Sequence, residues 1–263
     1  MNSFIKWAGS KKQLLPVISE LIPQHYNRYV EPFSGSARLF FQLTPEQAIL
    51  GDINKELIST YKAIKSNVES VIYHLSRFKK TKAEYYRLRK INSNELSKEK
   101  AAARFIYLNR FCFNGLYRTN QKGLFNVPFG GYKSNNLPPK SLLRECSVAL
   151  KKTTLIGGSF EKTISKAEHG DFIYLDPPYS VESRRVFNEY SNFSFGQKEI
   201  ESLRLHLEDL NSKNVLFMVS YAYSKEGLYL AEGFNKKIVL VRRNIAGFAS
   251  NRRKSKELII TNY

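Results

Sequence analysis

Residues 172–180, FIYLDPPYS, place one carboxylate between an apolar run and two prolines. Such a run is typical of a buried strand, so Asp176 stands where the strand ends. Proline fixes φ and has no N–H, so the carbonyl of Pro177 can point outward from a rigid turn. A carboxylate and a carbonyl held in this way suit the two hydrogens of an exocyclic amino group. Tyr179 adds a flat ring on which a nucleic-acid base can stack. A tight turn after a buried strand is the structural alternative.

A second candidate site lies nearer the N-terminus. The strand predicted at 29–33 leads into the small residues 34–37 and a helical pattern from Arg38. Such a turn brings backbone close to a ligand at a helix N-terminus, although it lacks the full G-x-G-x-x-G of dinucleotide-binding proteins. Asp52 ends the next predicted strand, 48–52, where an acid can bind ribose hydroxyls or cap a helix. Together the two stretches favour an adenosyl-type ligand at the carboxyl ends of the strands.

These residues need a framework of alternating strands and helices. The pattern predicts a helix over 197–210 and further strands at 171–175, 215–219, 237–241 and 257–261. Strands that alternate with helices are typical of a doubly wound α/β sheet.

Residues 55–142 break this alternation. They read as helices at 56–78, 82–91 and 98–109, followed by the aromatic, Gly- and Asn-rich stretch FCFNGLYRTNQKGLFNVPFGGYK. We therefore expect an inserted, mainly helical domain.

The charge is uneven and indicates a polyanionic partner. The chain has 42 Lys and Arg against 23 Asp and Glu, a net charge of +19. Residues 54–142 contain 18 Lys and Arg and 5 Glu, a net of +13, and a second basic cluster spans 242–256. Nucleic acid fits this distribution, because each neutralised phosphate releases condensed counterions.

Other classes of protein are disfavoured by composition. No apolar stretch reaches the roughly 18 residues of a membrane span, and the N-terminal residues have no signal-peptide pattern. Cys112 and Cys146 have no metal-ligand spacing, so we expect reduced thiols, a cytoplasmic location and no metal.

The chain resembles a known family, the Dam-type DNA adenine N6-methyltransferases (the D12 class, or alpha group), which use S-adenosylmethionine. The resemblance spans nearly the whole chain, through the collinear motifs FIKWAGSKKQLLP, VEPFSGSARLF, GDIN, LNRFCFNGLYR, GLFNVPFGGYK, YLDPPY and VRRNI…RRKSKELII. It implies a Rossmann-like class I methyltransferase sheet with an inserted target-recognition domain. The catalytic domain would comprise 1–54 and 143–263, and the inserted domain 55–142.

The resemblance also implies a role for particular residues. The enzyme would be a site-specific adenine DNA-methyltransferase (EC 2.1.1.72) that acts on double-stranded DNA as a monomer, commonly within GATC. Residues that match positions holding the flipped adenine are Asp176, Pro177, Pro178 and Tyr179. Residues that match the cofactor site are Trp7, Lys11, Glu31, Phe33, Gly35, Asp52, Ser159, Phe160 and Asp176. Residues that match DNA-reading positions are Lys6, Leu116, Arg118, Asn120 and Pro128, with Phe113 and Asn114 as a pair that inserts into the base stack. By charge, Arg252 and Arg253 would hold phosphate.

Two residues depart from the family pattern. Ala37 stands where a second glycine is usual, which should tighten the cofactor turn without blocking binding. Phe113 replaces a tyrosine, which keeps the wedge and loses a hydroxyl. Residues 181–195 are expected to form a loop that closes on DNA.

Two other functions remain open from the sequence. A methyltransferase of cytosine N4 or of RNA could use a similar turn, because the chemistry at an exocyclic amine is the same. A catalytically silent DNA-binding relative is the other, although the presence of Trp7, Lys11, Asp176 and Tyr179 argues against it. The residues are compatible with a role in a restriction-modification system, in a phage or in host regulation.

Overall fold

The computed structural model describes all residues except 8–10, 12, 122, 133–135, 180–194 and 243–253. Its described strands form one seven-stranded sheet in the order β3-β2-β1-β4-β5-β7-β6. Neighbouring strands are parallel except that β7 runs antiparallel to both β5 and β6. The strands are β1 (Tyr29–Glu31), β2 (Ala48–Asp52), β3 (Thr153–Gly157), β4 (Phe172–Leu175), β5 (Leu216–Ala222), β6 (Asn235–Arg242) and β7 (Lys254–Thr261). This is a doubly wound α/β sheet, as the pattern of strands and helices predicts, and it agrees with the Rossmann-like sheet that the resemblance implies.

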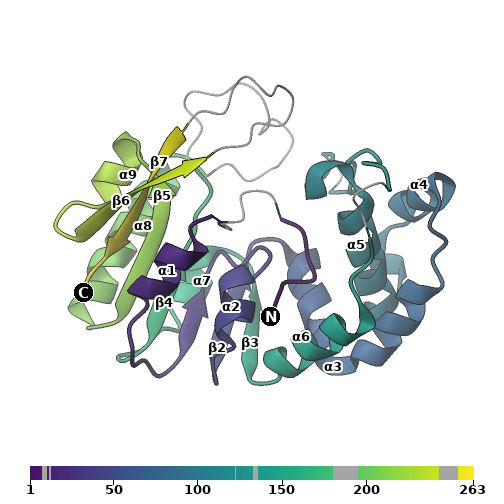
Figure 1. The fold of residues 1–263 in the computed structure, drawn as a ribbon, viewed down its shortest axis with the longest axis horizontal. Helices are drawn as coiled ribbons and strands as arrows, with labels where there is room; N and C mark the ends of the chain where they lie inside the picture. The colour runs from purple at the N-terminus through teal and green to yellow at the C-terminus, as the bar shows by residue number, and fades with distance from the viewer. Residues whose placement is uncertain (8–10, 12, 122, 133–135, 180–194, 243–253) are drawn as a thin grey trace.

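Helices cover both faces of the sheet (Figure 1). Side chains alternate along each strand: in β4, Phe172 and Tyr174 join one buried cluster, whereas Ile173 and Leu175 join the other. The first cluster packs against α1 (Leu15–Leu21), α2 (Arg38–Leu43) and α3 (Lys55–Ser76). The second packs against α7 (Phe160–Ile164), α8 (Gln197–Ser212) and α9 (Lys225–Leu230). The result is a three-layer α/β/α domain.

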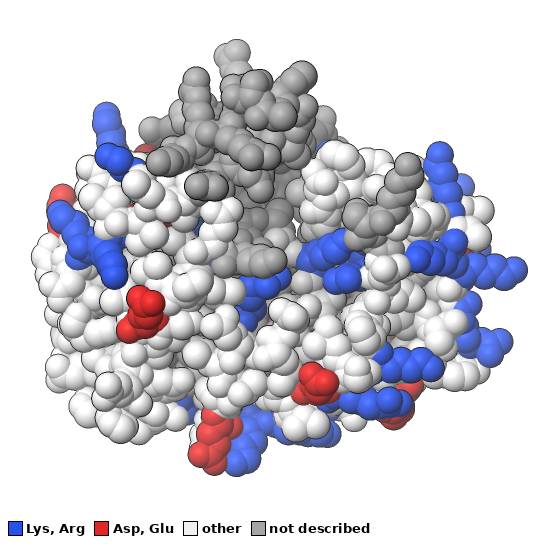
Figure 2. Space-filling view, in the orientation of Figure 1, with Lys and Arg blue, Asp and Glu red and all other residues white. Residues whose placement is uncertain are grey.

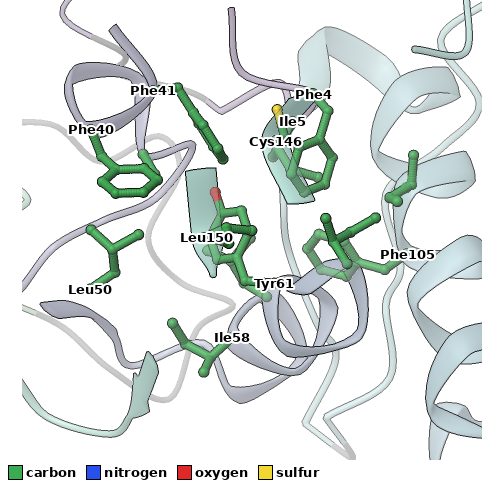
Figure 3. Packing of buried hydrophobic residues seen from close by; sticks show 14 of the residues in the cluster. Phe4, Ile5, Phe40, Phe41, Leu50, Ile58, Tyr61, Phe105, Cys146 and Leu150 are labelled. Carbon is green, nitrogen blue, oxygen red and sulfur yellow. The ribbon is translucent and has the colours of Figure 1, made fainter. Parts of the chain in front are cut away.

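The first cluster is rich in aromatic rings (Figure 3). Phe4 packs edge-on against Tyr61, with ring centroids 5.6 Å apart, and against Phe41 at 6.0 Å. The Tyr61 hydroxyl donates a hydrogen bond of 2.7 Å to the carbonyl of Gly35. The core therefore anchors the turn that follows β1.

The chain between β2 and β3 is helical, as predicted for the insertion. It contains α3, α4 (Lys82–Lys90), a 3-10 turn η1 (Ser93–Glu95), α5 (Lys98–Phe111), a second turn η2 (Phe113–Gly115) and α6 (Lys140–Leu150). In Figure 1, α4 and α5 lie to the right of the sheet, while α3 and α6 lie between them and it. An ion pair joins α5 to the first turn of α3, with Nη1 of the buried Arg104 lying 2.9 Å from Oε1 of the partly buried Glu56. Helix α3 bends at Asn67, whose φ of −149° is not helical.

Some elements differ from the sequence prediction. The predicted strand 29–33 ends at Glu31, because Pro32 has no N–H for the ladder. The prediction missed β3, which begins with two threonines and lies at the edge of the sheet, so its apolar run is short. None of the helices formed by the described residues is long and apolar enough to cross a membrane. Both cysteines are buried and unpaired, as expected.

Candidate active site

The Asp176–Tyr179 turn follows β4, which lies in the middle of the sheet. All four residues of β4 are buried, so the strand fixes the position of the turn. Pro177 is buried, Pro178 is exposed and Tyr179 is half-buried. The Asp176 side chain is 21% exposed, so it can be reached by a ligand.

The Asp176 carboxylate is held at one oxygen. Lys11 Nζ lies 3.1 Å from Oδ1, and the Ser220 hydroxyl donates to the same Oδ1 at 3.0 Å. Oδ2 accepts no hydrogen bond from any residue that the structure describes. Burial raises the pKa of Asp176, and Lys11 opposes this rise through its charge and its hydrogen bond. The arrangement leaves one oxygen able to accept a hydrogen from a ligand.

The Tyr179 side chain is held by Lys11 and by Glu257. Its hydroxyl accepts a hydrogen bond from Lys11 and donates one to Glu257. The Lys11 ammonium lies 4.2 Å from the centre of the Tyr179 ring, and the Tyr221 ring packs edge-on at 5.1 Å. Lys11 therefore joins both ends of the turn.

Sequence reasoning missed two residues of this site. Glu257, on β7, is 5% exposed and lies 3.7 Å from Lys11. Ser220, on β5, is fully buried and also contacts the hydroxyl of Tyr174 at 2.9 Å. A weak signal for Glu257 was available, because it is the sole acid in the basic tail 252–263. No sequence signal marked Ser220, because it meets Asp176 through the pairing of β5 with β4.

The predicted cofactor turn lies beside this site, at the end of β1. Gly35 has φ +45°, and its N–H donates to Asp52 Oδ2 at 2.9 Å. Asp52 Oδ1 accepts from the Asn54 N–H at 2.8 Å. Burial raises the pKa of Asp52 to about 6, and the two backbone hydrogen bonds oppose the rise. Asn54, not Asp52, caps α3, because its side chain accepts from the Leu57 N–H at 3.0 Å.

Trp7 closes one side of this turn. A Cβ added to Gly35 would lie 2.8 Å from Trp7 Cδ1, so a side chain cannot fit there without displacing the indole ring. The Trp7 ring also stacks with the Tyr117 ring, with centroids 5.9 Å apart and 21° between the ring planes. Ala37 is also left-handed, with φ +47°, which costs about 1–2 kcal/mol for a residue with a Cβ.

The remaining predicted cofactor residues lie around the turn. Phe33 stacks on Phe160 with ring centroids 5.2 Å apart, and Phe195 packs against both. Ser159 precedes α7 and makes no side-chain cap. Glu31 is buried, accepts from the Tyr29 hydroxyl at 2.9 Å, and has a pKa raised well above its usual value by burial.

The inserted region brings four predicted DNA-reading residues together. Phe113 and Asn114 form the exposed turn η2, in which Asn114 has φ +52°. The Phe113 N–H donates to the Pro128 carbonyl at 3.0 Å. Gly115 lies directly against the Lys6 side chain, since a Cβ there would be 2.7 Å from Lys6 Cβ.

The other predicted DNA-reading residues are placed differently. Arg118 donates from Nε to Asn126 Oδ1 at 2.7 Å, and Asn120 Oδ1 accepts from the Leu124 N–H at 3.0 Å, within one loop. Leu116 is half-buried and packs against the core. Arg252, Arg253 and the predicted loop 181–195, apart from Phe195, lie outside the described residues.

The charge pattern agrees with the sequence analysis. In Figure 2, Lys and Arg side chains outnumber Asp and Glu over the right-hand half of the face shown, which α3–α6 form. Within the described part of the chain, no group of His, Cys, Asp or Glu could hold a metal ion.

An adenosyl-type cofactor fits the residues beside Asp176. Asp52 presents two carboxylate oxygens that each accept a single backbone N–H, which leaves acceptor capacity for ribose hydroxyls. The Ser34 hydroxyl is buried in the turn and has no hydrogen-bond partner among the described residues. Gly35 itself is buried, and the Trp7 ring occupies the space that its Cβ would fill.

Comparisons with known proteins identify the family of the chain. Residues 7–245 match the model of the D12 class N6 adenine-specific DNA methyltransferases. The chain is 37% identical to the type II methyltransferase M1.LlaDCHI of Lactococcus lactis subsp. cremoris, over 100% of this chain and 96% of that protein. It is 34% identical to the type II methyltransferase M.MjaIII of Methanocaldococcus jannaschii, over 100% and 99% of the two chains. It is 33% identical to a DNA adenine methylase of Haemophilus influenzae, over 97% and 92%.

Proposed function

Because the chain belongs to the D12 class of N6 adenine-specific DNA methyltransferases, we propose that it methylates N6 of an adenine flipped out of double-stranded DNA. The methyl donor would be S-adenosylmethionine, and the reaction would be that of EC 2.1.1.72. The observation that carries the proposal is the partly exposed Asp176 carboxylate, whose Oδ2 is bonded by no described residue. It stands on a turn that also carries Tyr179, beside a turn able to hold an adenosyl group.

The cofactor would be held at the carboxyl ends of β1 and β2. Asp52 would accept the ribose hydroxyls, while Trp7 and the Gly35 backbone would contact the ligand across the turn. Phe33 and Phe160 offer an apolar wall for its adenine ring. When bound, S-adenosylmethionine supplies a methyl group already activated by the sulfonium.

The protein then has to position and polarise the target amine. Asp176 Oδ2 and the Pro177 carbonyl would accept the two N6 hydrogens, which directs the nitrogen lone pair toward the methyl group. The carboxylate would also stabilise the positive charge that develops on nitrogen during attack, and one N6 proton would leave after transfer to restore a neutral nitrogen. Lys11 would hold Asp176 ionised, because its ammonium lies 3.1 Å from Oδ1. Tyr179 would stack on the flipped base.

The DNA-reading role is assigned to the insertion, residues 55–142. The proposal rests on its net charge of +13 and on the cluster of Lys6, Phe113, Asn114 and Pro128. Phe113, 48% exposed, would enter the base stack, and Arg118 would read a base pair, with GATC as the proposed site. Residues 1–54 and 143–263 would form the catalytic domain of a cytoplasmic monomer.

Methylation assays on defined substrates test this function. Purified protein and labelled S-adenosylmethionine should modify double-stranded DNA that contains GATC, and nucleoside analysis should yield N6-methyladenine. N4-methylcytosine, or methylated RNA, would instead support the alternative substrates. Failure to bind S-adenosylmethionine would support a catalytically silent DNA-binding protein. Sequencing with modified-base detection would identify the site.

Asp176→Ala separates chemistry from binding. We expect methylation to be abolished while DNA affinity is largely retained, since phosphate contacts supply most of the affinity. Near-normal turnover in this variant would contradict the proposed role of Asp176. Asp209→Ala, which changes an exposed carboxylate on α8, is the matched control and should leave turnover unchanged.

A further inference from the structure

Tyr174, Ser220 and Asp176 form a chain of hydrogen bonds, and the ionised carboxylate determines which atom donates in each bond. An ionised carboxylate can only accept, so the Ser220 hydroxyl donates its single proton to Asp176 Oδ1 at 3.0 Å. The Ser220 oxygen must then accept from the Tyr174 hydroxyl, 2.9 Å away. Burial, followed by the nearby Asp176 charge, raises the pKa of Tyr174 well above its usual value, so Tyr174 remains a donor.

The central sheet fixes the positions of the three residues in this hydrogen-bond chain. Tyr174 lies on β4 and Ser220 on the parallel neighbour β5, both buried, and Asp176 follows β4 directly. In the ladder, Tyr174 pairs with Met218 and Leu175 with Val219, so the next position of β5 comes beside Asp176. Strand pairing therefore brings the Ser220 hydroxyl against Oδ1.

We propose that Ser220, supported by Tyr174, is a positioning residue that orients the Asp176 carboxylate for the target amine. Ser220 and Lys11 occupy Oδ1 and thereby leave Oδ2 for the substrate. Without the Ser220 hydroxyl the carboxylate can rotate about χ2, and a buried negative charge loses a donor. This inference rests on the proposed function of Asp176.

The groups around Asp176 determine how the loss of Ser220 should change the pKa of its carboxyl. Lys11, from the N-terminal segment, lowers the pKa of Asp176, whereas Glu257 on β7 raises it. Glu31 on β1 is coupled to Asp176 by charge repulsion. Ser220 acts in the same direction as Lys11, so its removal should raise the pKa of Asp176 further.

The test is a pH profile of methylation by Ser220→Ala. We expect kcat near neutral pH to fall about tenfold, the scale of a hydrogen bond to a charged group, and the acidic limb to move to higher pH. Affinity for DNA should remain within about twofold of wild type, because Ser220 is buried. Ser220→Thr retains the hydroxyl and should restore the limb. Tyr174→Phe should move the limb in the same direction by less, since the Ser220 hydroxyl remains.

Ser147→Ala is the matched control, because Ser147 is a buried serine on α6, a helix that packs against α3. This control should change neither kcat nor the position of the acidic limb of the pH profile. A wild-type profile in Ser220→Ala would overturn the inference, as would a loss of kcat with an unmoved limb that Ser220→Thr does not restore.

A second measurement keeps the inference separate from the proposed function. NMR titration of ¹³C-labelled aspartate carboxyls follows Asp176 directly and needs no turnover. If wild-type protein methylated no nucleic acid, the proposed function would fail, while a higher Asp176 pKa in Ser220→Ala would still support the contact. An unchanged Asp176 pKa would overturn it, and Tyr174→Phe provides the same comparison if Ser220→Ala does not fold.

Discussion

Replacing Gly35 by alanine tests how the cofactor turn is built. The substitution adds a methyl group 2.8 Å from Trp7 Cδ1 and 3.0 Å from Nε1, both inside van der Waals contact. It also places a Cβ on a residue with φ +45°. The left-handed backbone costs about 1–2 kcal/mol, and forced displacement of a packed ring costs about 1–3 kcal/mol more. We therefore expect the free energy of unfolding to fall by about 2–5 kcal/mol.

Gly233→Ala separates these two costs. Gly233 has φ +74° with nothing within 4 Å of an added Cβ, so this variant carries the backbone cost alone, about 1–2 kcal/mol. The difference between the two variants measures the contact with Trp7.

The assay uses fluorescence, because Trp7 is the sole tryptophan of the chain. Urea unfolding of both variants gives the stability difference, and the native emission spectrum reports whether the indole ring moves off Tyr117. Titration with S-adenosylmethionine should show weakened binding for Gly35→Ala and unchanged binding for Gly233→Ala. Equal destabilisation of the two variants, with unchanged emission, would refute the packing of Trp7 against the turn.

The remaining predictions concern charge. Because the folded pKa of Asp52 is about 6 against an ordinary 3.8, its stabilising contribution is fully present below pH 3.8 and lost as pH rises through 6, roughly 3 kcal/mol in all. Asp52→Asn should lack this part of the pH dependence in urea unfolding, and an unchanged profile would contradict it. Arg104→Met leaves Glu56 partly buried without its 2.9 Å partner and should cost about 3–5 kcal/mol, of which a second change, Glu56→Gln, should recover part. Arg118→Met should lower discrimination at one base pair by about 1–3 kcal/mol in binding assays with substituted sites, whereas an equal loss for all sequences would indicate a phosphate contact. Substituting Arg252 and Arg253 should weaken binding to every sequence and flatten its salt dependence.

Much of the fold was predictable because its signals are local. Helices α3, α4 and α5 follow from apolar periodicity and from the caps Asn54, Thr81 and Ser97. Strand β3 was missed because an edge strand that begins with two threonines gives little apolar signal.

The chemistry of the site was also readable along the chain. The sequence by itself determined that a carboxylate, two prolines and a tyrosine end a buried strand, since these residues are contiguous. It also indicated a small-residue turn before a helix and a basic insertion. Asp52 was ambiguous between a helix cap and a ligand contact, because both uses place an acid at the end of a strand.

The tertiary structure decided which side chains and backbone groups contact the site residues. It assigned the cap to Asn54 and tied Asp52 to the Gly35 backbone. It also brought Lys11, Ser220 and Glu257 to the turn at Asp176, from segments separated by up to about 250 residues. The physical reason is that the order and register of strands are set by burial across the whole sheet. A residue's neighbours on adjacent strands therefore leave no pattern in its own stretch of sequence.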